Sequence, residues 1–504
     1  MGFVLIVDFG GQYAHLIARR IRELGVYSEL LSASSDLETI LDFAGRSQGV
    51  VLSGGPLSVT EGRHDEIAKS LLRLGKPLLG ICYGHQLLAK VLGGSVGRSP
   101  APEFGPTKVE LSPDELFEGI PAKVTVWMSH NDAVLEAPPG AKVLARTRGS
   151  PVAAMRYGAH WSVQWHPEVS HTQYGLQMYD NWLRAIGARR DWRPENMIEE
   201  LTEMVRREIG GSLAVSAVSG GVDSTVASLI VKRAIGERLV PILIDHGLHP
   251  AGEPELSIAL LENVGLKPLV IKAEEEFFSA LKGIREPEEK RRAFGRLYAR
   301  LLEDQAERLG AEFLVQGTIY PDVIESGGRV GASVIKTHHN VAGMPKQLRF
   351  KVVEPLKWFY KDEVRAIGRK LGVPEEILRR QPVPGPALAV RVEGEVTRER
   401  VELVRRADAI VREEIEGAGI GGLWQYFAVL TSSKATGVKG DERAYGHVIA
   451  IRAVESVDAM TASIARLPWE VLERIAARIT GEVPGVTRVV YDITSKPPAT
   501  VEWE

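Results

Sequence analysis

The chain has one cysteine, Cys82, and its neighbours favour a chemical role. Gly80–Gly84 follows an apolar run and precedes a helical pattern. It has the form of a nucleophile elbow, Gly-x-Ser-x-Gly, with sulfur in place of oxygen. The glycines let the backbone turn sharply, and the amino end of the following helix stabilises a thiolate. A lone cysteine is more often a buried structural residue, but the glycines and the strand-to-helix position favour a nucleophile.

A histidine and a carboxylate two residues apart could serve this thiol. A thiol nucleophile needs a base, and the base needs an orienting group. His166-Pro167-Glu168 supplies both directly after the apolar run Trp161–Trp165. Alone, such a loop is usually a solvated turn; together with the elbow it makes His166 the candidate base and Glu168 its carboxylate. Ser53–Pro56 ends another apolar run, where the backbone N–H groups of Ser-Gly-Gly-Pro can face an oxyanion or form an ordinary glycine-rich turn.

A second glycine-rich motif, Ser219-Gly220-Gly221-Val222-Asp223-Ser224 followed by Thr225, opens a helical pattern after the apolar run Leu213–Val218. Small residues let backbone N–H groups approach a phosphate, and a helix amino end favours negative charge. The Walker pattern requires a lysine that is absent here. The loop is therefore better suited to holding pyrophosphate as a leaving group than to passing on a terminal phosphoryl group. Because a carboxylate repels phosphates directly, Asp223 is assigned to Mg²⁺ or to loop geometry.

The elements that must position these residues alternate between strand and helix patterns. Val4–Val7, Gly49–Leu52 and Pro77–Ile81 predict buried parallel strands, and Leu16–Leu24 and His85–Leu92 predict helices. This alternation implies a parallel sheet with helices on both faces. Further segments rich in Thr and Val predict antiparallel strands; they are Lys123–Trp127, Val143–Thr147, Val152–Tyr157 and His160–Trp165.

Two more parts follow a charged, proline-containing linker at residues 188–199. Residues 200–383 repeat the α/β pattern, with strands predicted at Leu213–Val218, Val240–Asp245, Pro268–Ile271 and Phe313–Gln316 and helices at Val222–Arg233 and Arg291–Leu309. Gln381–Pro386 fits neither a helix nor a central strand and marks the next boundary. Residues 384–504 mix helices with strands, predicted as helices Thr397–Glu416, Val457–Ala462 and Glu470–Thr480 and strands Phe427–Leu430, His447–Val454 and Arg488–Ile493.

Composition excludes several classes of protein. The 504 residues include 62 Lys and Arg against 65 Asp and Glu, for a net charge of −3. Disorder is excluded because the composition matches an ordinary globular protein, and no positive excess exists to bind nucleic acid. One cysteine excludes an internal disulfide framework. No apolar run approaches the roughly 18 residues of a membrane span, and no secretion signal is present. We therefore expect a soluble, cytoplasmic protein with no membrane or nucleic-acid partner.

The first part of the chain closely resembles the class I (triad) glutamine amidotransferases over residues 1–187. The resemblance implies that Cys82 attacks the side-chain amide of L-glutamine and releases ammonia, while His166, oriented by Glu168, acts as general base and then as acid. It also implies that the amides of Gly55 and Tyr83 form the oxyanion hole and that Gln86 touches the glutamine. The matching motifs are Asp8–Gln12, Ser53–Pro56, Gly80–Gln86, Ser129–Asp132 and His166–Glu168.

The second motif resembles the signature of the N-type ATP pyrophosphatases, which adenylate an oxygen and then displace AMP. Gln316–Ser326, Lys336–Val341 and Val489–Glu504 are in addition similar to the glutamine-hydrolysing GMP synthetase family, and this resemblance runs from end to end. It implies that XMP is converted to GMP through an adenyl-XMP intermediate. The reaction would consume ATP and glutamine, require Mg²⁺, and release AMP and pyrophosphate. The implied fold is α/β: two parallel-sheet domains, a class I glutaminase and an ATP pyrophosphatase of the adenine-nucleotide α-hydrolase type, with a C-terminal α+β domain that forms a homodimer.

The same resemblance assigns roles near the carboxyl end and in a lid segment. Lys496 would bind the XMP phosphate, and Glu502 and the backbone at Val501 would contact the nucleotide; for Lys496 the alternative is a solvated tail lysine. The lid segment over the ATP phosphates would contain Glu325, Lys336, His338 and His339. Gln381–Leu388 and Leu430–Asp441 depart from the usual pattern of the family.

Three other functions compete with this interpretation. Another glutamine-dependent adenylating amidase, such as one acting on an NAD precursor, is disfavoured by the segment Tyr491–Glu504. A tRNA-modifying sulfur transferase shares the Ser-Gly-Gly-x-Asp-Ser loop but would be expected to need sulfur-carrying cysteines besides Cys82. A non-catalytic binding protein is disfavoured by the presence of Cys82, His166 and Glu168 together.

Overall fold

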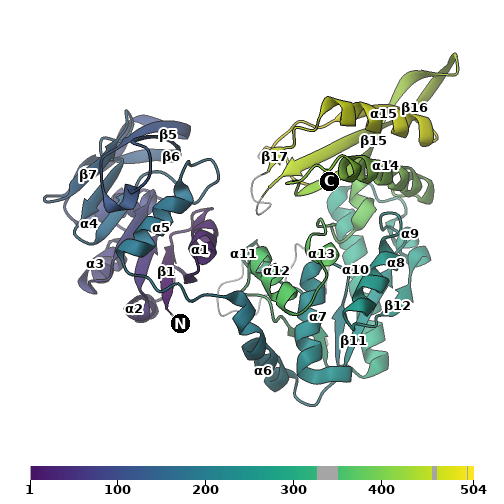
Figure 1. The fold of residues 1–504 in the computed structure, drawn as a ribbon, viewed down its shortest axis with the longest axis horizontal. Coiled ribbons are helices and arrows are strands. Elements are labelled where there is room, and N and C mark those ends of the chain that lie inside the picture. The colour runs from purple at the N-terminus through teal and green to yellow at the C-terminus, as the bar shows by residue number, and fades with distance from the viewer. Residues whose placement is uncertain (1, 326–349, 457–461, 497) are drawn as a thin grey trace. The chain divides into compact units, whose positions relative to one another are not determined.

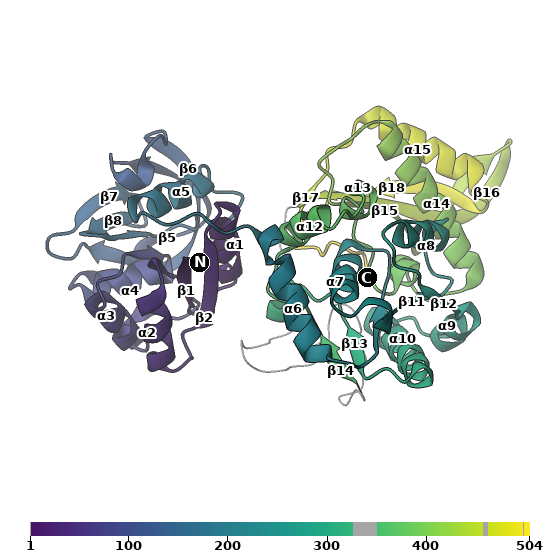
Figure 2. The same cartoon turned by 60° about the horizontal axis from the view of Figure 1, so that its bottom comes forward.

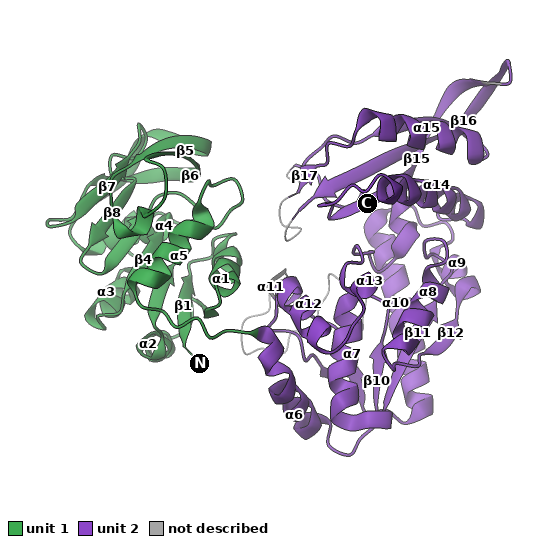
Figure 3. Ribbon diagram, viewed as in Figure 1, with its two compact units in different colours: residues 1–193 green, residues 194–504 purple. Residues whose placement is uncertain are grey.

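The computed structural model describes residues 2–325, 350–456, 462–496 and 498–504. The chain divides into two compact units, residues 1–193 and 194–504 (Figure 3). The division falls inside the predicted linker, residues 188–199. None of the helices within the described ranges combines the length and the apolar character needed to cross a bilayer.

Unit 1 is built on one nine-stranded sheet with the order β2-β1-β3-β4-β9-β8-β7-β5-β6 (Figure 1). Neighbouring strands from β2 to β9 run parallel: β2 (Tyr27–Ser32), β1 (Phe3–Asp8), β3 (Gly49–Leu52), β4 (Leu78–Ile81) and β9 (His160–Val163). From β9 onward, each strand pairs antiparallel with the next in the order. These strands are β8 (Ala154–Tyr157), β7 (Lys142–Arg146), β5 (Ser95–Leu111) and β6 (Lys123–Glu136). The predicted change from parallel to antiparallel strands is confirmed.

Helices cover both faces of the parallel part. α1 packs beside α5, while α2, α3 and α4 pack beside one another, as right-handed crossovers require when the strand order reverses after β2. The helices are α1 (Ala14–Glu23), α2 (Leu37–Arg46), α3 (Asp65–Arg73), α4 (Tyr83–Val91) and α5 (Gly175–Ala185). The core between the sheet and the second group is mainly aliphatic, with residues such as Leu5, Ile40, Val50 and Leu87, and it also contains Phe9 and Tyr83.

Unit 2 begins with a five-stranded, fully parallel sheet (Figure 2). Its order is β12 (Leu269–Lys272), β11 (Leu239–Asp245), β10 (Ala214–Ala217), β13 (Phe313–Val315) and β14 (Lys351–Val353). The associated helices are α6 (Ile198–Ile209), α7 (Val222–Ile235), α8 (Glu253–Asn263), α9 (Glu274–Leu281), α10 (Pro287–Leu309), α11 (Tyr320–Glu325), α12 (Lys361–Lys370) and α13 (Glu375–Leu378). The predicted second parallel-sheet α/β part is confirmed, and β14 is an addition to it.

The carboxyl-terminal part of unit 2 has a four-stranded sheet and two long helices. Its central strand, β16 (Glu442–Glu455), pairs antiparallel with β15 (Gln425–Lys439) and β17 (Ser463–Ile464) and parallel with β18 (Val486–Tyr491). One core joins both sheets of the unit through α10 and α14 (Arg398–Gly417), and α15 (Trp469–Glu482) packs into the same core.

One predicted helix, Val457–Ala462, is not borne out at its last residue. Ala462 forms an antiparallel β-bridge with Lys496, in which each residue donates its N–H to the carbonyl oxygen of the other. Residues 457–461 lie outside the described residues. The two backbone hydrogen bonds of the bridge satisfy groups that a helical turn would have paired locally.

Candidate active sites

The strand-to-helix turn at Cys82 has the geometry of a nucleophile elbow. Cys82 follows β4 and precedes α4 with φ 52° and ψ −103°, a conformation that L-residues rarely adopt. A Cβ on Gly84 would lie 2.2 Å from the carbonyl oxygen of Leu52, and one on Gly80 would lie 2.6 Å from the carbonyl oxygen of Gly84. Both glycines are therefore required by close backbone packing, as the motif predicted.

His166 and Glu168 form a buried pair beside the thiol. His166 Nδ1 lies 2.6 Å from Glu168 Oε1, and both side chains are almost fully buried. A Cβ on Gly54 would lie 3.0 Å from His166 Cε1 and 3.7 Å from Cys82 Cβ. Gly54 thus lies against both residues, and the absence of its side chain lets the imidazole approach the nucleophile. The structure brings the predicted base, its carboxylate and the thiol together.

Charge determines the protonation of this histidine. Burial by itself lowers the pKa of His166, but the negative charges of Glu168 and Cys82, with hydrogen bonds to both, outweigh it and raise the pKa to about 10. Tyr179 Oη donates to Glu168 Oε2 at 3.4 Å, and its pKa is raised well above 10 by burial and by Glu168. Tyr179 therefore stays a neutral donor to Glu168.

The predicted oxyanion-hole amides belong to Gly55 and Tyr83. In the described part of the chain, neither backbone N–H donates a hydrogen bond, so both are available to a developing negative charge. A Cβ on Gly55 would lie 2.9 Å from the carbonyl oxygen of Phe9. Tyr83 is the first residue of α4, and its hydroxyl lies 2.8 Å from His64 Nδ1, which fixes its ring beside Phe9.

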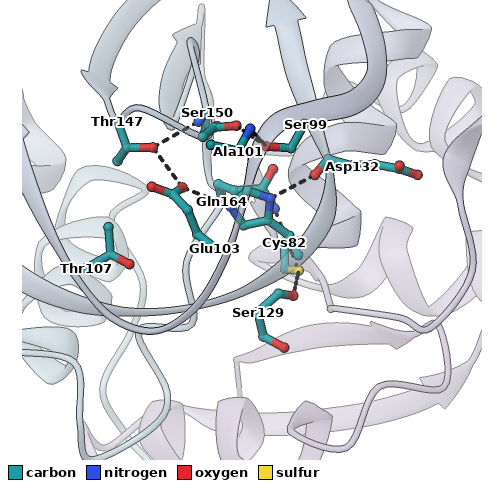
Figure 4. Close-up of polar contacts among 12 residues, drawn as sticks. Cys82, Ser99, Ala101, Glu103, Thr107, Ser129, Asp132, Thr147, Ser150 and Gln164 are labelled. Atoms are coloured by element: carbon teal, nitrogen blue, oxygen red, sulfur yellow. Dashed lines mark hydrogen bonds and ion pairs between the residues drawn. The ribbon is translucent and has the colours of Figure 1, made fainter.

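Two glutamine side chains, Gln164 and Gln86, connect the thiol to the backbone of β6, and Figure 4 shows Gln164 beside Cys82. Gln164 Nε2 donates to Cys82 Sγ at 3.7 Å, and the thiol donates to the carbonyl oxygen of Ser129 at 3.6 Å. Gln86 Nε2 donates to the carbonyl oxygen of Asp132 at 2.7 Å and to Gln164 Oε1 at 3.2 Å. Gln164 was missed by the sequence analysis, although it lies only two residues before the candidate base.

The predicted phosphate loop forms the turn between β10 and α7. Ser219 N donates to Ser224 Oγ at 3.3 Å, and Gly221 N donates to Ser219 Oγ at 3.4 Å. Thr225 Oγ1 donates to the carbonyl oxygen of Gly221 at 2.8 Å. Gly220 has φ +73°, and a Cβ there would lie 2.4 Å from Ser257 Oγ. The loop is therefore folded by its own hydroxyl groups around a glycine that no larger residue can replace.

Asp223, the predicted Mg²⁺ ligand, lies in the first turn of α7. Its Oδ2 lies 2.5 Å from Lys361 Nζ, whereas Oδ1 is buried and has no hydrogen-bond partner among the residues that the structure describes. The described residues hold no cluster of three or more metal-ligating side chains. A buried carboxylate oxygen without a partner fits Mg²⁺, which usually binds one or two carboxylates together with substrate phosphates. Lys361 was not anticipated because it lies 138 residues further along the chain.

Two buried arginines organise the segment that carries the predicted nucleotide contacts. Arg452 donates to the carbonyl oxygen of Val501 at 2.7 Å and pairs with Asp492. Arg391 donates to both carboxylate oxygens of Glu502 at 3.2 Å and lies 4.1 Å from the ring of Phe427. Glu502 is thus paired inside the protein, and its carboxylate is held in place by Arg391. The sequence analysis missed both arginines.

The other predicted contacts are only partly described. Lys496 forms the bridge to Ala462 and is half-buried. Glu325 ends α11, and its side chain is not described. Lys336, His338 and His339 lie outside the described residues.

Comparison with known proteins connects both ends of the chain to one family. Residues 5–186 match the family model of class I glutamine amidotransferases, and residues 413–503 match that of the GMP synthase C-terminal domain. The glutamine-hydrolyzing GMP synthase of Aeropyrum pernix is 67% identical over 504 residues, 99% of this chain and 98% of that protein. Those of Thermomicrobium roseum and Pyrobaculum aerophilum are 50% and 48% identical, over 99% of this chain and 96% and 99% of theirs. The chain therefore belongs to the glutamine-hydrolysing GMP synthase family.

Proposed function

We propose that the protein converts XMP to GMP with ammonia taken from L-glutamine, coupled to cleavage of ATP to AMP and pyrophosphate. The observation that carries the proposal is one chain that holds two chemically complementary sites. The buried Cys82–His166–Glu168 arrangement in unit 1 suits amide hydrolysis, and the Ser219–Thr225 loop in unit 2 suits pyrophosphate release. The family relationship over the full chain supports the same reaction.

The glutaminase step begins with proton transfer from the Cys82 thiol to His166. The raised pKa of His166 favours this transfer. Sγ then attacks the amide carbon of glutamine, and the N–H groups of Gly55 and Tyr83 bind the oxyanion. His166 returns the proton to the leaving nitrogen, so that the C–N bond breaks and ammonia departs. Water, deprotonated by His166, hydrolyses the thioester and releases glutamate.

In the adenylating step, the backbone N–H groups of the Ser219–Thr225 loop hold the β- and γ-phosphates of ATP. The O2 atom of XMP attacks the α-phosphorus, and pyrophosphate leaves. Ammonia then attacks C2 of the purine, and AMP leaves with the former O2. Asp223, through its buried free oxygen, is the residue to hold Mg²⁺, which supplies positive charge to the departing pyrophosphate.

The remaining parts of the proposal concern the nucleotide pocket and the assembly. Lys496, Glu502 and the backbone at Val501 bind XMP, with Glu502 positioned by Arg391. The segment with Glu325, Lys336, His338 and His339 covers the ATP phosphates. Residues 1–187 are the glutaminase domain, 200–383 the adenylating domain and 384–504 the XMP-binding dimerisation domain. The protein acts as a homodimer in the cytoplasm. Light scattering of the purified chain should therefore give the mass of two subunits.

Isotope transfer tests the proposed reaction. The full chain is incubated with ATP, Mg²⁺, XMP and glutamine labelled with ¹⁵N at the amide, and each component is omitted in turn. With all components present, we expect ¹⁵N at the 2-amino group of GMP, formed together with AMP. With ammonium salt added, glutamine can be omitted without loss of GMP formation. Omission of ATP, Mg²⁺ or XMP should still prevent it. GMP without amide label, or AMP release that does not require XMP, would overturn the proposal.

A further inference from the structure

A buried carboxylate–histidine pair lies beside the glutaminase nucleophile and takes no part in the steps above. Glu103 on β5 and His130 on β6 are directly opposite each other in the antiparallel register. Glu103 Oε2 lies 3.1 Å from His130 Nε2, and the two side chains are 12% and 1% exposed. Cross-strand pairs of this kind fix the register and side-chain positions of a sheet.

The ring of His130 is held at both of its nitrogens. Nε2 faces the Glu103 carboxylate, and Nδ1 lies 3.0 Å from the carbonyl oxygen of Asp132. Thr147 Oγ1 donates to the same carboxylate oxygen of Glu103 at 2.8 Å, and it accepts the N–H of Ser150 at 2.9 Å (Figure 4). The arrangement is a buried carboxylate–histidine pair with its carboxylate anchored on the adjoining loop.

The carboxylate–histidine pair holds the backbone segment that touches the nucleophile. His130 lies between Ser129, whose carbonyl oxygen accepts from the Cys82 thiol, and Asp132, whose carbonyl oxygen accepts from Gln86. Figure 4 shows Thr147 hydrogen-bonded to Glu103, and Cys82 beside Ser129. The pair therefore reaches Gln86, a residue proposed to bind glutamine, through the shared Asp132 carbonyl oxygen. It also lies next in the chain to Ser129, whose carbonyl oxygen accepts from the reacting sulfur.

We infer that Glu103 is a positioning residue for glutamine binding, acting through His130; this inference rests on the proposed function. The Glu103 carboxylate fixes the His130 ring through Nε2, and the ring holds the Asp132 carbonyl where Gln86 needs it. Without the carboxylate, the ring would lose this anchor and the segment would move. Glu103 touches none of the reacting atoms, so its loss affects the fit of glutamine more than the chemical step.

The test is the full-length variant Glu103→Gln, which keeps the shape and the acceptor oxygen but removes the charge. The matched control is Glu110→Gln, an exposed glutamate on the same strand opposite Lys123. KM and kcat for glutamine are measured by glutamate release, and GMP formation is also measured with ammonium salt. We expect Glu103→Gln to raise KM for glutamine about tenfold, the effect of losing one charge-assisted hydrogen bond, with kcat changed by less than about threefold. Ammonia-dependent GMP formation, and both activities of the control, should match those of the wild type.

A double-mutant cycle with His130→Gln distinguishes a coupled pair from two independent effects. We expect the KM of the double variant to lie within about twofold of that of the worse single variant. Additive effects in the cycle, an unchanged KM in Glu103→Gln, or equal loss of the glutamine- and ammonia-dependent reactions would each overturn the inference. Failure of the wild-type chain to release glutamate would instead overturn the proposed function.

Discussion

Removal of the charge on Glu168 is the sharpest test of the proposed glutaminase chemistry. Glu168 Oε1 lies 2.6 Å from His166 Nδ1 in a site where the carboxylate side chain is fully buried. The substitution Glu168→Gln preserves size and one acceptor oxygen. It leaves His166 without the negative charge that, together with Cys82, raises its pKa. The imidazolium that must form when the thiol loses its proton is then much less stable.

The magnitude follows from the pKa of His166 and the burial of the pair. The rise from 6.5 to about 10 corresponds to about 5 kcal/mol of imidazolium stabilisation at ~1.4 kcal/mol for each pKa unit. Glu168 and Cys82 share this stabilisation, and breaking a buried ion pair costs on the order of 3–5 kcal/mol. We therefore expect Glu168→Gln to lose about 3 kcal/mol of the driving force for proton transfer, a decrease in glutamate release of roughly a hundredfold.

The assay compares two nitrogen sources in the same preparation. Glutamate release and glutamine-dependent GMP formation should both fall about a hundredfold, while GMP formation from ammonium salt at alkaline pH is unchanged. Glu118→Gln is the matched control, since Glu118 is exposed and pairs with the surface residue Arg184 in an ion pair of the kind that contributes little. Glutamate release by Glu168→Gln within threefold of the wild-type rate would refute the assigned role.

Three further predictions separate the two sites and probe the core of unit 2. Cys82→Ala should abolish glutamate release and keep ammonia-dependent GMP formation; loss of both activities would show that the two chemistries are not divided as proposed. Asp223→Asn should reduce GMP formation from either nitrogen source on the order of a hundredfold while glutamate release persists, as measured by AMP and glutamate assays. Burial, and to a smaller extent the neighbouring His249, lowers the pKa of His246 well below 6.5. As the pH falls below 6.5, the unfolded protein therefore binds more protons at this residue than the folded protein does. The free energy of unfolding, from denaturant titrations, should therefore fall by up to about 2 kcal/mol from pH 6.5 to pH 5, and His246→Asn should flatten this dependence; an equal slope in the variant contradicts it.

Strands with continuous apolar runs could be predicted from the sequence, whereas strands that depend on distant partners could not. β3 and β4 are buried on both faces, and they appear in the sequence as continuous apolar runs. β5 contains three prolines and many exposed positions, and it forms a strand because β6 supplies a long antiparallel partner. β14 has only three residues, too few for a periodic pattern, and it exists because β13 offers an open edge.

The same distinction holds for the candidate sites. Cys82, Glu168 and the Ser219–Ser224 loop lie in short motifs whose chemistry is contained in neighbouring residues. Lys361 and Glu103 act through pairings across 138 and 27 residues, which are set by the packing of α12 against α7 and by the register of β5 on β6. No local spacing specifies such pairings, so they could be found only in the structure.

The left-handed backbone at Cys82 has a consequence for how the protein evolves. Its φ of 52° costs a non-glycine residue on the order of 1–3 kcal/mol, and glycine would adopt it without strain. Selection for thermal stability alone would therefore favour glycine in place of Cys82. The protein retains this strained turn because it places the sulfur beside His166, and a catalytically inactive homologue without that requirement should drift toward glycine at this position.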